Sequence, residues 1–209
     1  MHAMLAALVG VSVAAGAGLR AGLALLAIGV LARYGGLELG ASYQFLTGLP
    51  ALLIFGFAAL VEVLGDLTLA VDHALDSAGT ILRPIAGAIL AAAVLAKSNP
   101  TLSTSLALLL GGGTALLVHC AKASLRAETS AFAPLHAGCG NASLSLLEDV
   151  AVVLGMLAVW RAPVVAAVGG ALAVLGAAGT LIHCRRAGVQ LWRWLTWGRW
   201  SRPETEGRA

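Results

Sequence analysis

The sequence predicts an all-α protein, a polytopic bundle of about six transmembrane helices. Of its 209 residues, 59% are hydrophobic and 11% are charged, and the mean hydropathy is +0.91. Soluble domains carry roughly 25% charged residues, so this chain cannot cover a water-facing surface, and a soluble enzyme is excluded. The 26 glycines have no collagen-like three-residue period, and they fit helices that approach closely or break within a membrane.

A membrane helix needs about 20 apolar residues to cross roughly 30 Å of hydrocarbon. The first span, near 5–32, would be about 42 Å long as a straight helix. Glycines surround Arg20 in its middle, so we expect a broken segment or a re-entrant pair of half-helices, retained in the protein rather than cleaved as a signal peptide. The other spans are expected near 49–65, 82–97, 102–120, 144–161 and 164–183.

The basic residues divide the chain into a transmembrane helical domain at 1–184 and an interfacial tail at 185–209. The tail holds six arginines, two glutamates and four tryptophans. Indole rings and guanidinium groups suit the headgroup zone of a bilayer, so we expect this tail to bind anionic lipid headgroups. Stacking of the same rings on nucleic-acid bases is disfavoured, because so short a tether lies against the bilayer. We expect no nucleic-acid partner.

The distribution of basic residues predicts the orientation. With six spans and a cytoplasmic tail, the N-terminus is also cytoplasmic. Nine basic residues then lie inside and three lie outside, in agreement with the positive-inside rule. Three spans on each side of residues 98–100 would form an inverted repeat, a hypothesis supported by the similarity of GLRA at 18–21 to SLRA at 124–127.

Charged side chains within or beside apolar spans identify a candidate site. Each costs about 2.5–3.5 kcal/mol at mid-bilayer, so each needs a partner or a polar cavity. Arg20 at a helix break suits an anion, although it also suits neutralisation of Glu62 or Asp66. On one continuous helix, the charged residues from 62 to 83 share an arc of about 120°: Glu62, Asp66, Asp72, His73, Asp76 and Arg83. An interruption at 65–68 would instead make them a hydrated loop.

Two further segments carry polar groups. His119, Lys122 and Arg126 fall on one helical face. A glycine-bracketed turn containing Asn141 leads into Glu148 and Asp149 at the start of a span, where the helix dipole favours carboxylates, so capping and function are both open. Glu148 and Asp149 point about 100° apart, so only one is expected to face a given cavity.

Metal and enzyme chemistry have weaker support. His119-Cys120 and His183-Cys184 resemble two pairs of metal ligands, but we favour buried thiols and interfacial imidazoles, with no metal or other cofactor. Three cysteines without a CxxC pattern argue against a disulfide framework. The sequence contains neither GxSxG nor HExxH, and we expect no enzymatic activity.

In combination, the motifs resemble the membrane-protein family described as domain of unknown function 4126. The resemblance extends over most of the chain to about residue 184. It rests on GLRA near the start, ExxxD and DHxxD at 62–76, RPxxG at 83–87, HxxKxxxR at 119–126, and GxGN followed by SLLED at 138–149. It implies a polytopic protein of a bacterial-type inner (plasma) membrane. Leu67 follows Asp66 where family members carry a lysine, so a pairing role of that lysine does not transfer.

The leading functional hypothesis is a small transporter or translocator of an anionic or lipid-phosphate-type substrate. The expected substrate-binding residues are Arg20, Lys122, Arg126 and Asn141, and the expected ion-coupling residues are Glu62, Asp66, Asp76, Glu148 and Asp149. The alternative is a non-transporting membrane scaffold or assembly factor whose charges serve as interhelical pairs. The expected partners are the lipid bilayer and a small anion or lipid, and a homo-oligomer remains open.

Overall fold

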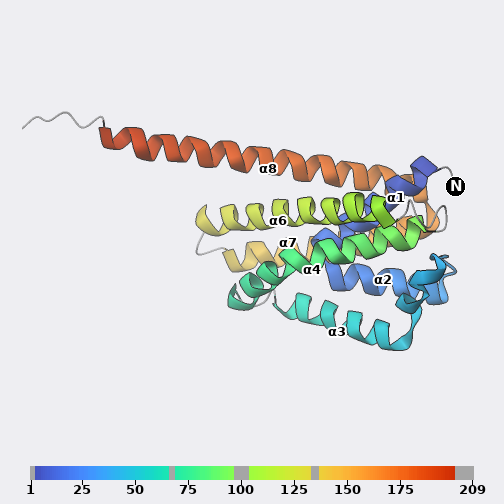
Figure 1. Ribbon diagram of the computed structural model, residues 1–209. Coiled ribbons are helices and arrows are strands. Elements are labelled where there is room, and N and C mark those ends of the chain that lie inside the picture. The colour runs from blue at the N-terminus through green and yellow to red at the C-terminus, as the bar shows by residue number, and fades with distance from the viewer. Residues whose placement is uncertain (1–2, 66–68, 97–103, 133–136, 201–209) are drawn as a thin grey trace, which may run out of the picture.

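The computed structural model describes residues 3–65, 69–96, 104–132 and 137–200, and confirms the all-α helix bundle (Figure 1). Side chains are described for 4–65, 74–96, 104–127 and 143–189. The elements are α1 (Ala3–Leu19), α2 (Ala21–Tyr34), the 3-10 helix η1 (Ala41–Thr47), α3 (Leu49–Gly65), α4 (Leu69–Leu95), the π-helical stretch η2 (Ala107–Gly112), α6 (Gly113–Phe132), α7 (Ala137–Arg161) and α8 (Pro163–Trp200).

The apolar helices make the protein a multi-pass integral membrane protein. In the described ranges, four segments are long and apolar enough to cross a membrane: Ala74–Leu95, Thr104–Ala127, Ser143–Arg161 and Pro163–Val189. The bent pair of η1 and α3, with 62° between them, makes a fifth if it counts as one span. Both α1 and α2 are shorter than a full span. The structure therefore has four or five complete spans where about six were predicted.

The first apolar segment is a helical hairpin. Its two helices meet at Arg20, whose backbone is extended, with φ −145° and ψ 97°. Gly10 of α1 packs against Leu95, and Gly35 after α2 packs against Trp160, so both arms reach the same end of the bundle (Figure 1). The tip, residues 18–22, lies inside the bundle. The expected break is thus present, and it has the form of a re-entrant pair of half-helices.

Two glycines seat this hairpin tip directly on neighbouring backbones. A Cβ at Gly18 would lie 2.6 Å from the carbonyl oxygen of Ala115 in α6. A Cβ at Gly22 would lie 2.6 Å from the backbone nitrogen of Ala59 in α3. Any side chain at either position would push the tip outward, and small residues are the usual means by which membrane helices approach this closely.

The core of the bundle lies around the hairpin. Val13, Ile28, Leu90 and Met156 from α1, α2, α4 and α7 are almost fully buried in one cluster. By contrast, α3 and α8 present many large apolar side chains on their outer surfaces, among them Phe57 and Leu175. An exposed apolar surface of this kind matches surrounding lipid.

The two ends of the described chain lie at opposite ends of the bundle. The N-terminus is at the right of Figure 1, and α8 extends past the other helices to the left. The chain enters and leaves the hairpin of α1 and α2 at the same end of the bundle. The helices that follow, α3, α4, α6, α7 and α8, run in alternating directions, so α8 finishes at the opposite end. The prediction that both termini share one side depended on six spans, and the arrangement of the chain contradicts it.

The last helix passes through the boundary predicted between residues 184 and 185 without a break, since α8 is continuous to Trp200. The tail therefore begins as an extension of α8. The side chains of residues 190–209, which include the Trp/Arg segment, lie outside the described residues.

The two segments that suggested an inverted repeat have different backbones. Arg20 lies between two helices, whereas Arg126 lies within α6. The similar residues at 18–21 and 124–127 therefore do not mark equivalent turns.

Candidate functional site

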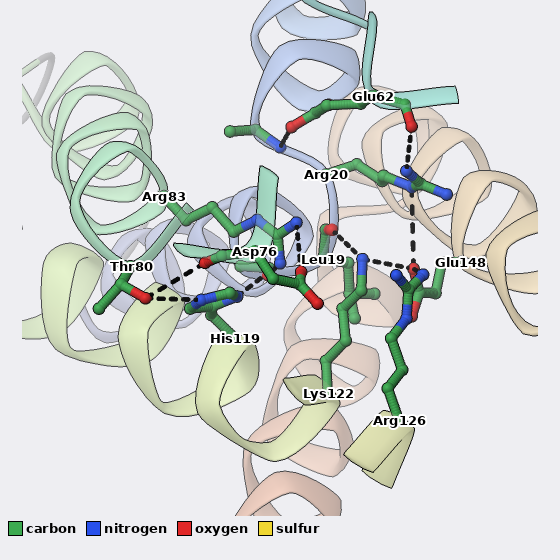
Figure 2. A network of polar contacts seen from close by, with 12 residues as sticks. Leu19, Arg20, Glu62, Asp76, Thr80, Arg83, His119, Lys122, Arg126 and Glu148 are labelled. Carbon is green, nitrogen blue, oxygen red and sulfur yellow. Dashed lines mark hydrogen bonds and ion pairs between the residues drawn. The ribbon is translucent and has the colours of Figure 1, made fainter. Parts of the chain in front are cut away.

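Charged side chains from five parts of the chain converge at the hairpin tip (Figure 2). Arg20 comes from the tip, and the others come from α3, α4, α6 and α7. We call this set the charged cluster: Arg20, Glu62, Asp76, Arg83, His119, Lys122, Arg126, Glu148 and Asp149. Four basic groups thus face four carboxylates beside one histidine. Arg20 is 1% exposed and Glu148 is 8% exposed, so these charges are withdrawn from solvent.

Glu148 is the centre of the cluster. Its Oε2 lies 2.7 Å from Nζ of Lys122, 3.3 Å from Nη2 of Arg126 and 3.7 Å from Nε of Arg20. Nη2 of Arg126 also donates to the hydroxyl of Ser145 at 2.8 Å. Buried charges are tolerated when they are paired and hydrogen-bonded. One carboxylate oxygen therefore compensates three basic groups at once.

Asp149 contacts the same arginine as its neighbour. Its Oδ1 lies 2.8 Å from Nε of Arg20, so the prediction that only one of the two acids faces a given site is wrong. The long side chain of Arg20 reaches both carboxylates. Capping is also wrong, because α7 begins at Ala137, about three turns before Glu148. The predicted turn at 138–141 is helical, and the side chain of Asn141 lies outside the described residues.

Basic side chains also hold the backbone of the hairpin tip. Nζ of Lys122 donates to the carbonyl oxygen of Leu19 at 3.1 Å, and Nη1 of Arg83 donates to that of Gly18 at 3.4 Å. These carbonyls belong to the last turn of α1, where the helix leaves its acceptors unpaired and the dipole favours cations. The cluster thus fixes the tip as well as neutralising charge.

Glu62 of α3 caps the second arm of the hairpin. Its Oε1 and Oε2 accept hydrogen bonds from the backbone N–H groups of Ala21 and Gly22, each at 3.1 Å. The backbone carbonyl of Glu62 accepts from Nη1 of Arg20 at 3.2 Å. A carboxylate at a helix N-terminus is favoured by the free N–H groups and by the dipole. Here the cap comes from another helix, because the side chain of Arg20 makes no cap of its own.

Arg83 and His119 form a second branch of the cluster. Nη1 of Arg83 donates to Nδ1 of His119, and Nη2 of Arg83 lies 3.4 Å from Oδ1 of Asp76. Nε2 of His119 lies 3.2 Å from the hydroxyl of Thr80. Since Nδ1 accepts from Arg83, Nε2 carries the ring hydrogen and donates to Thr80. The imidazole therefore links α4 to α6.

The acidic segment that was predicted to share one helical arc lies on two separate helices. Glu62 belongs to α3 and Asp76 belongs to α4, and the two helices are separate elements. Asp66 lies outside the described residues, as do the side chains of 72 and 73. Asp76 and Arg83 lie two turns apart on one face of α4 and contact each other.

An apolar pocket of about 330 Å³ adjoins the cluster between α2, α3 and α4. Glu62 and Arg83 are its only charged lining residues within the described ranges. The remaining lining is aliphatic, aromatic or glycine, and includes Leu25, Phe55 and Ile89. The charged cluster thus has an apolar space on one side.

These features define a multi-pass membrane protein with a buried, charge-balanced cluster at the tip of a re-entrant helical hairpin. Residues 7–183 match the family described as Domain of unknown function (DUF4126), and the chain belongs to that family. The matched range contains the hairpin from residue 7 onward and the whole charged cluster. Comparison with curated proteins and with solved structures yields no match.

Proposed function

We propose that the protein is a small transporter of a phosphate-type anion, and that the charged cluster is its substrate and coupling site. The observation that carries the proposal is the triple contact of Glu148: one carboxylate oxygen occupies a position that Lys122, Arg126 and Arg20 all reach. Guanidinium and ammonium groups in such an arrangement also match the oxygens of a phosphate.

The charge balance suggests a coupling mechanism. When a proton or a metal cation neutralises Glu148, the three basic groups lose their shared counter-charge. An incoming anion then replaces that charge and binds the same groups. The cluster stays neutral only if the anion and the coupling cation arrive together, because an excess buried charge is costly. Intramembrane carboxylates serve this role in transporters.

The hairpin tip supplies the moving element in this proposal. Lys122 binds both Glu148 and the carbonyl oxygen of Leu19. When Lys122 turns to a substrate oxygen, the tip loses that hydrogen bond. Helix ends that stop inside a membrane form the sites of many secondary transporters, and we propose that the tip opens one side of the site.

Uptake of inorganic phosphate into proteoliposomes, with and without a proton gradient, tests the proposal. We expect uptake that the gradient drives, loss of uptake in Arg126→Gln, and uptake that no longer responds to the gradient in Glu148→Gln. Arg186→Gln, which removes an exposed charge of α8, should behave as the wild type. Wild-type protein that is folded and moves neither phosphate nor a short-chain lipid phosphate would overturn the transporter.

A membrane scaffold is the second candidate. The equal numbers of basic and acidic groups in the charged cluster favour it. Apart from Asp76 and Arg83, which pair within α4, the described ion pairs reach between helices or from the tip to a helix, as Lys122 and Glu148 join α6 to α7. The double variant Lys122→Gln with Glu148→Gln removes one charge of each sign and so separates the two functions. A scaffold keeps most of its stability and its assembly, whereas a transporter keeps its fold and loses gradient-driven phosphate uptake.

A further inference from the structure

The pocket between α2, α3 and α4 is long and runs along the helices. Its lining on α4 extends from Leu75 to Ile89, which is about 21 Å at 1.5 Å per residue. Its volume of about 330 Å³ is at the lower end of the roughly 300–1,000 Å³ of small-molecule sites. These dimensions suit one hydrocarbon chain lying parallel to the helices.

The charged groups lie in one half of this pocket. Glu62 is at one end of the α3 lining, two turns from Phe55, and Arg83 is near the middle of the α4 lining, between Leu75 and Ile89. The half that contains Phe55 and Ile89 is apolar throughout, so a molecule that fills the pocket needs a polar group in one half and an apolar part in the other. Membrane lipids have this polarity along the same direction as the helices.

The side of the pocket opens on the outer surface of α4. Leu82 and Ile85 line the pocket and are 60% and 52% exposed, and Ala78 beside them is also exposed. Because α4 is one of the membrane-spanning segments, this opening faces lipid. A bilayer lipid reaches the pocket sideways without crossing water.

The polar half of the pocket contains a buried hydrogen-bond donor that has no partner among the described residues. Arg83 is 4% exposed, and its two Nη groups contact Asp76, His119 and the carbonyl of Gly18. Its Nε is buried and has no hydrogen-bond partner among the described residues. A Cβ at Gly79, which also lines the pocket, would lie 2.9 Å from this Nε, so any side chain at that position would cover it. Buried donors in proteins are normally satisfied by a hydrogen-bond partner.

We propose that the pocket binds one acyl chain of a membrane phospholipid, and that an ester or phosphate oxygen of that lipid accepts a hydrogen bond from Nε of Arg83. The chain lies along α4 beside Phe55 and Ile89, where it contacts apolar side chains. The binding uses the pocket and not Glu148, so it holds whether or not the protein transports phosphate.

Photocrosslinking in liposomes tests this site on the full chain. The probe is a phospholipid with a diazirine in its acyl chain, and mass spectrometry locates the crosslinked peptides. We expect crosslinks concentrated on the pocket segments of α2, α3 and α4. Ala78→Phe fills the pocket mouth and should reduce them several-fold. Ala74→Phe, also exposed on α4 but outside the pocket lining, should leave them unchanged.

Two further experiments distinguish the site from ordinary lipid contact. Arg83→Lys keeps the charge but removes the Nε donor, and should shift crosslinks away from the part of α4 around Arg83. Excess inorganic phosphate should not compete, because it lacks the chain. Crosslinks that simply follow exposed apolar area, with α8 labelled as strongly as the pocket, would show surface lipid only and overturn the proposal. Equal labelling of Ala78→Phe and Ala74→Phe would overturn it too. Neither result depends on phosphate uptake.

Discussion

At the scale of single residues, Glu148 compensates three basic groups, while every other carboxylate in the cluster has fewer charged contacts among the described pairs. Removing its charge leaves Lys122, Arg126 and Arg20 close together in a medium that solvates them poorly. Breaking a buried ion pair in this way costs more than the pair contributes when it is intact. The stability of the tip therefore depends on this carboxylate.

Glu148→Gln should lower the free energy of unfolding by about 3–5 kcal/mol, the usual cost of an uncompensated buried charge. The double variant with Lys122→Gln should recover part of that loss, because it removes one of the unbalanced cations. Denaturant unfolding in mixed micelles, followed by circular dichroism, measures both. Arg186→Gln, at an exposed position, should change stability by less than about 0.5 kcal/mol. Equal stability of Glu148→Gln and wild type would contradict the geometry of the cluster.

The sequence identified most of the charged residues but not their pairs. The spacing of Lys122 and Arg126 placed them on one face of a helix, and both reach Glu148. Ser145 and Thr80 were missed, although each lies three residues before a cluster member on the same helix, a spacing that puts them on a shared face. The direct contact of Arg83 with His119 had no signal in the sequence, because it depends on how α4 packs against α6.

At the scale of elements, the hairpin shows what a length argument can and cannot predict. A 28-residue apolar segment is too long for an upright span, and this indicated a break near Arg20. The sharp reversal at Arg20 depends on packing, since Gly18 and Gly22 seat the tip on α6 and α3. Local sequence indicates where a helix stops, whereas the direction of the next helix is set by its neighbours.

Close contact between α4 and the η2–α6 segment gives a test at this scale. A Cβ at Gly87 would lie 2.5 Å from the Cβ of Ala115 and 2.7 Å from the carbonyl oxygen of Gly111. We expect Gly87→Ala to cost about 1–3 kcal/mol, the range for overpacking. A Cβ at Gly176 in α8 would meet nothing within 4 Å, so Gly176→Ala should be neutral or stabilise by up to about 1 kcal/mol.

Thermal unfolding of the two variants in the same detergent compares them directly. The difference depends on the close crossing of these helices and not on the loss of a glycine as such. If Gly87→Ala proved as stable as Gly176→Ala, the helices would not approach as described.

At the scale of the whole molecule, the number of spans differs from the prediction. We still propose, from the positive-inside rule, that the end of α8 that carries the arginines faces the cytoplasm. With η1 and α3 counted as one span, counting apolar runs gave one span too many, because a run that enters and returns has the same composition as one that crosses.

The re-entrant hairpin supports both proposals, since it places the tip in the charged cluster and beside the pocket. The most direct test is the sidedness of the two termini in the native membrane, measured by protease protection of a tag at either end. The account predicts that the two tags lie on opposite sides, with the C-terminal tag in the cytoplasm. Two tags protected together on the same side would mean that the first segment crosses the membrane, and would contradict the hairpin.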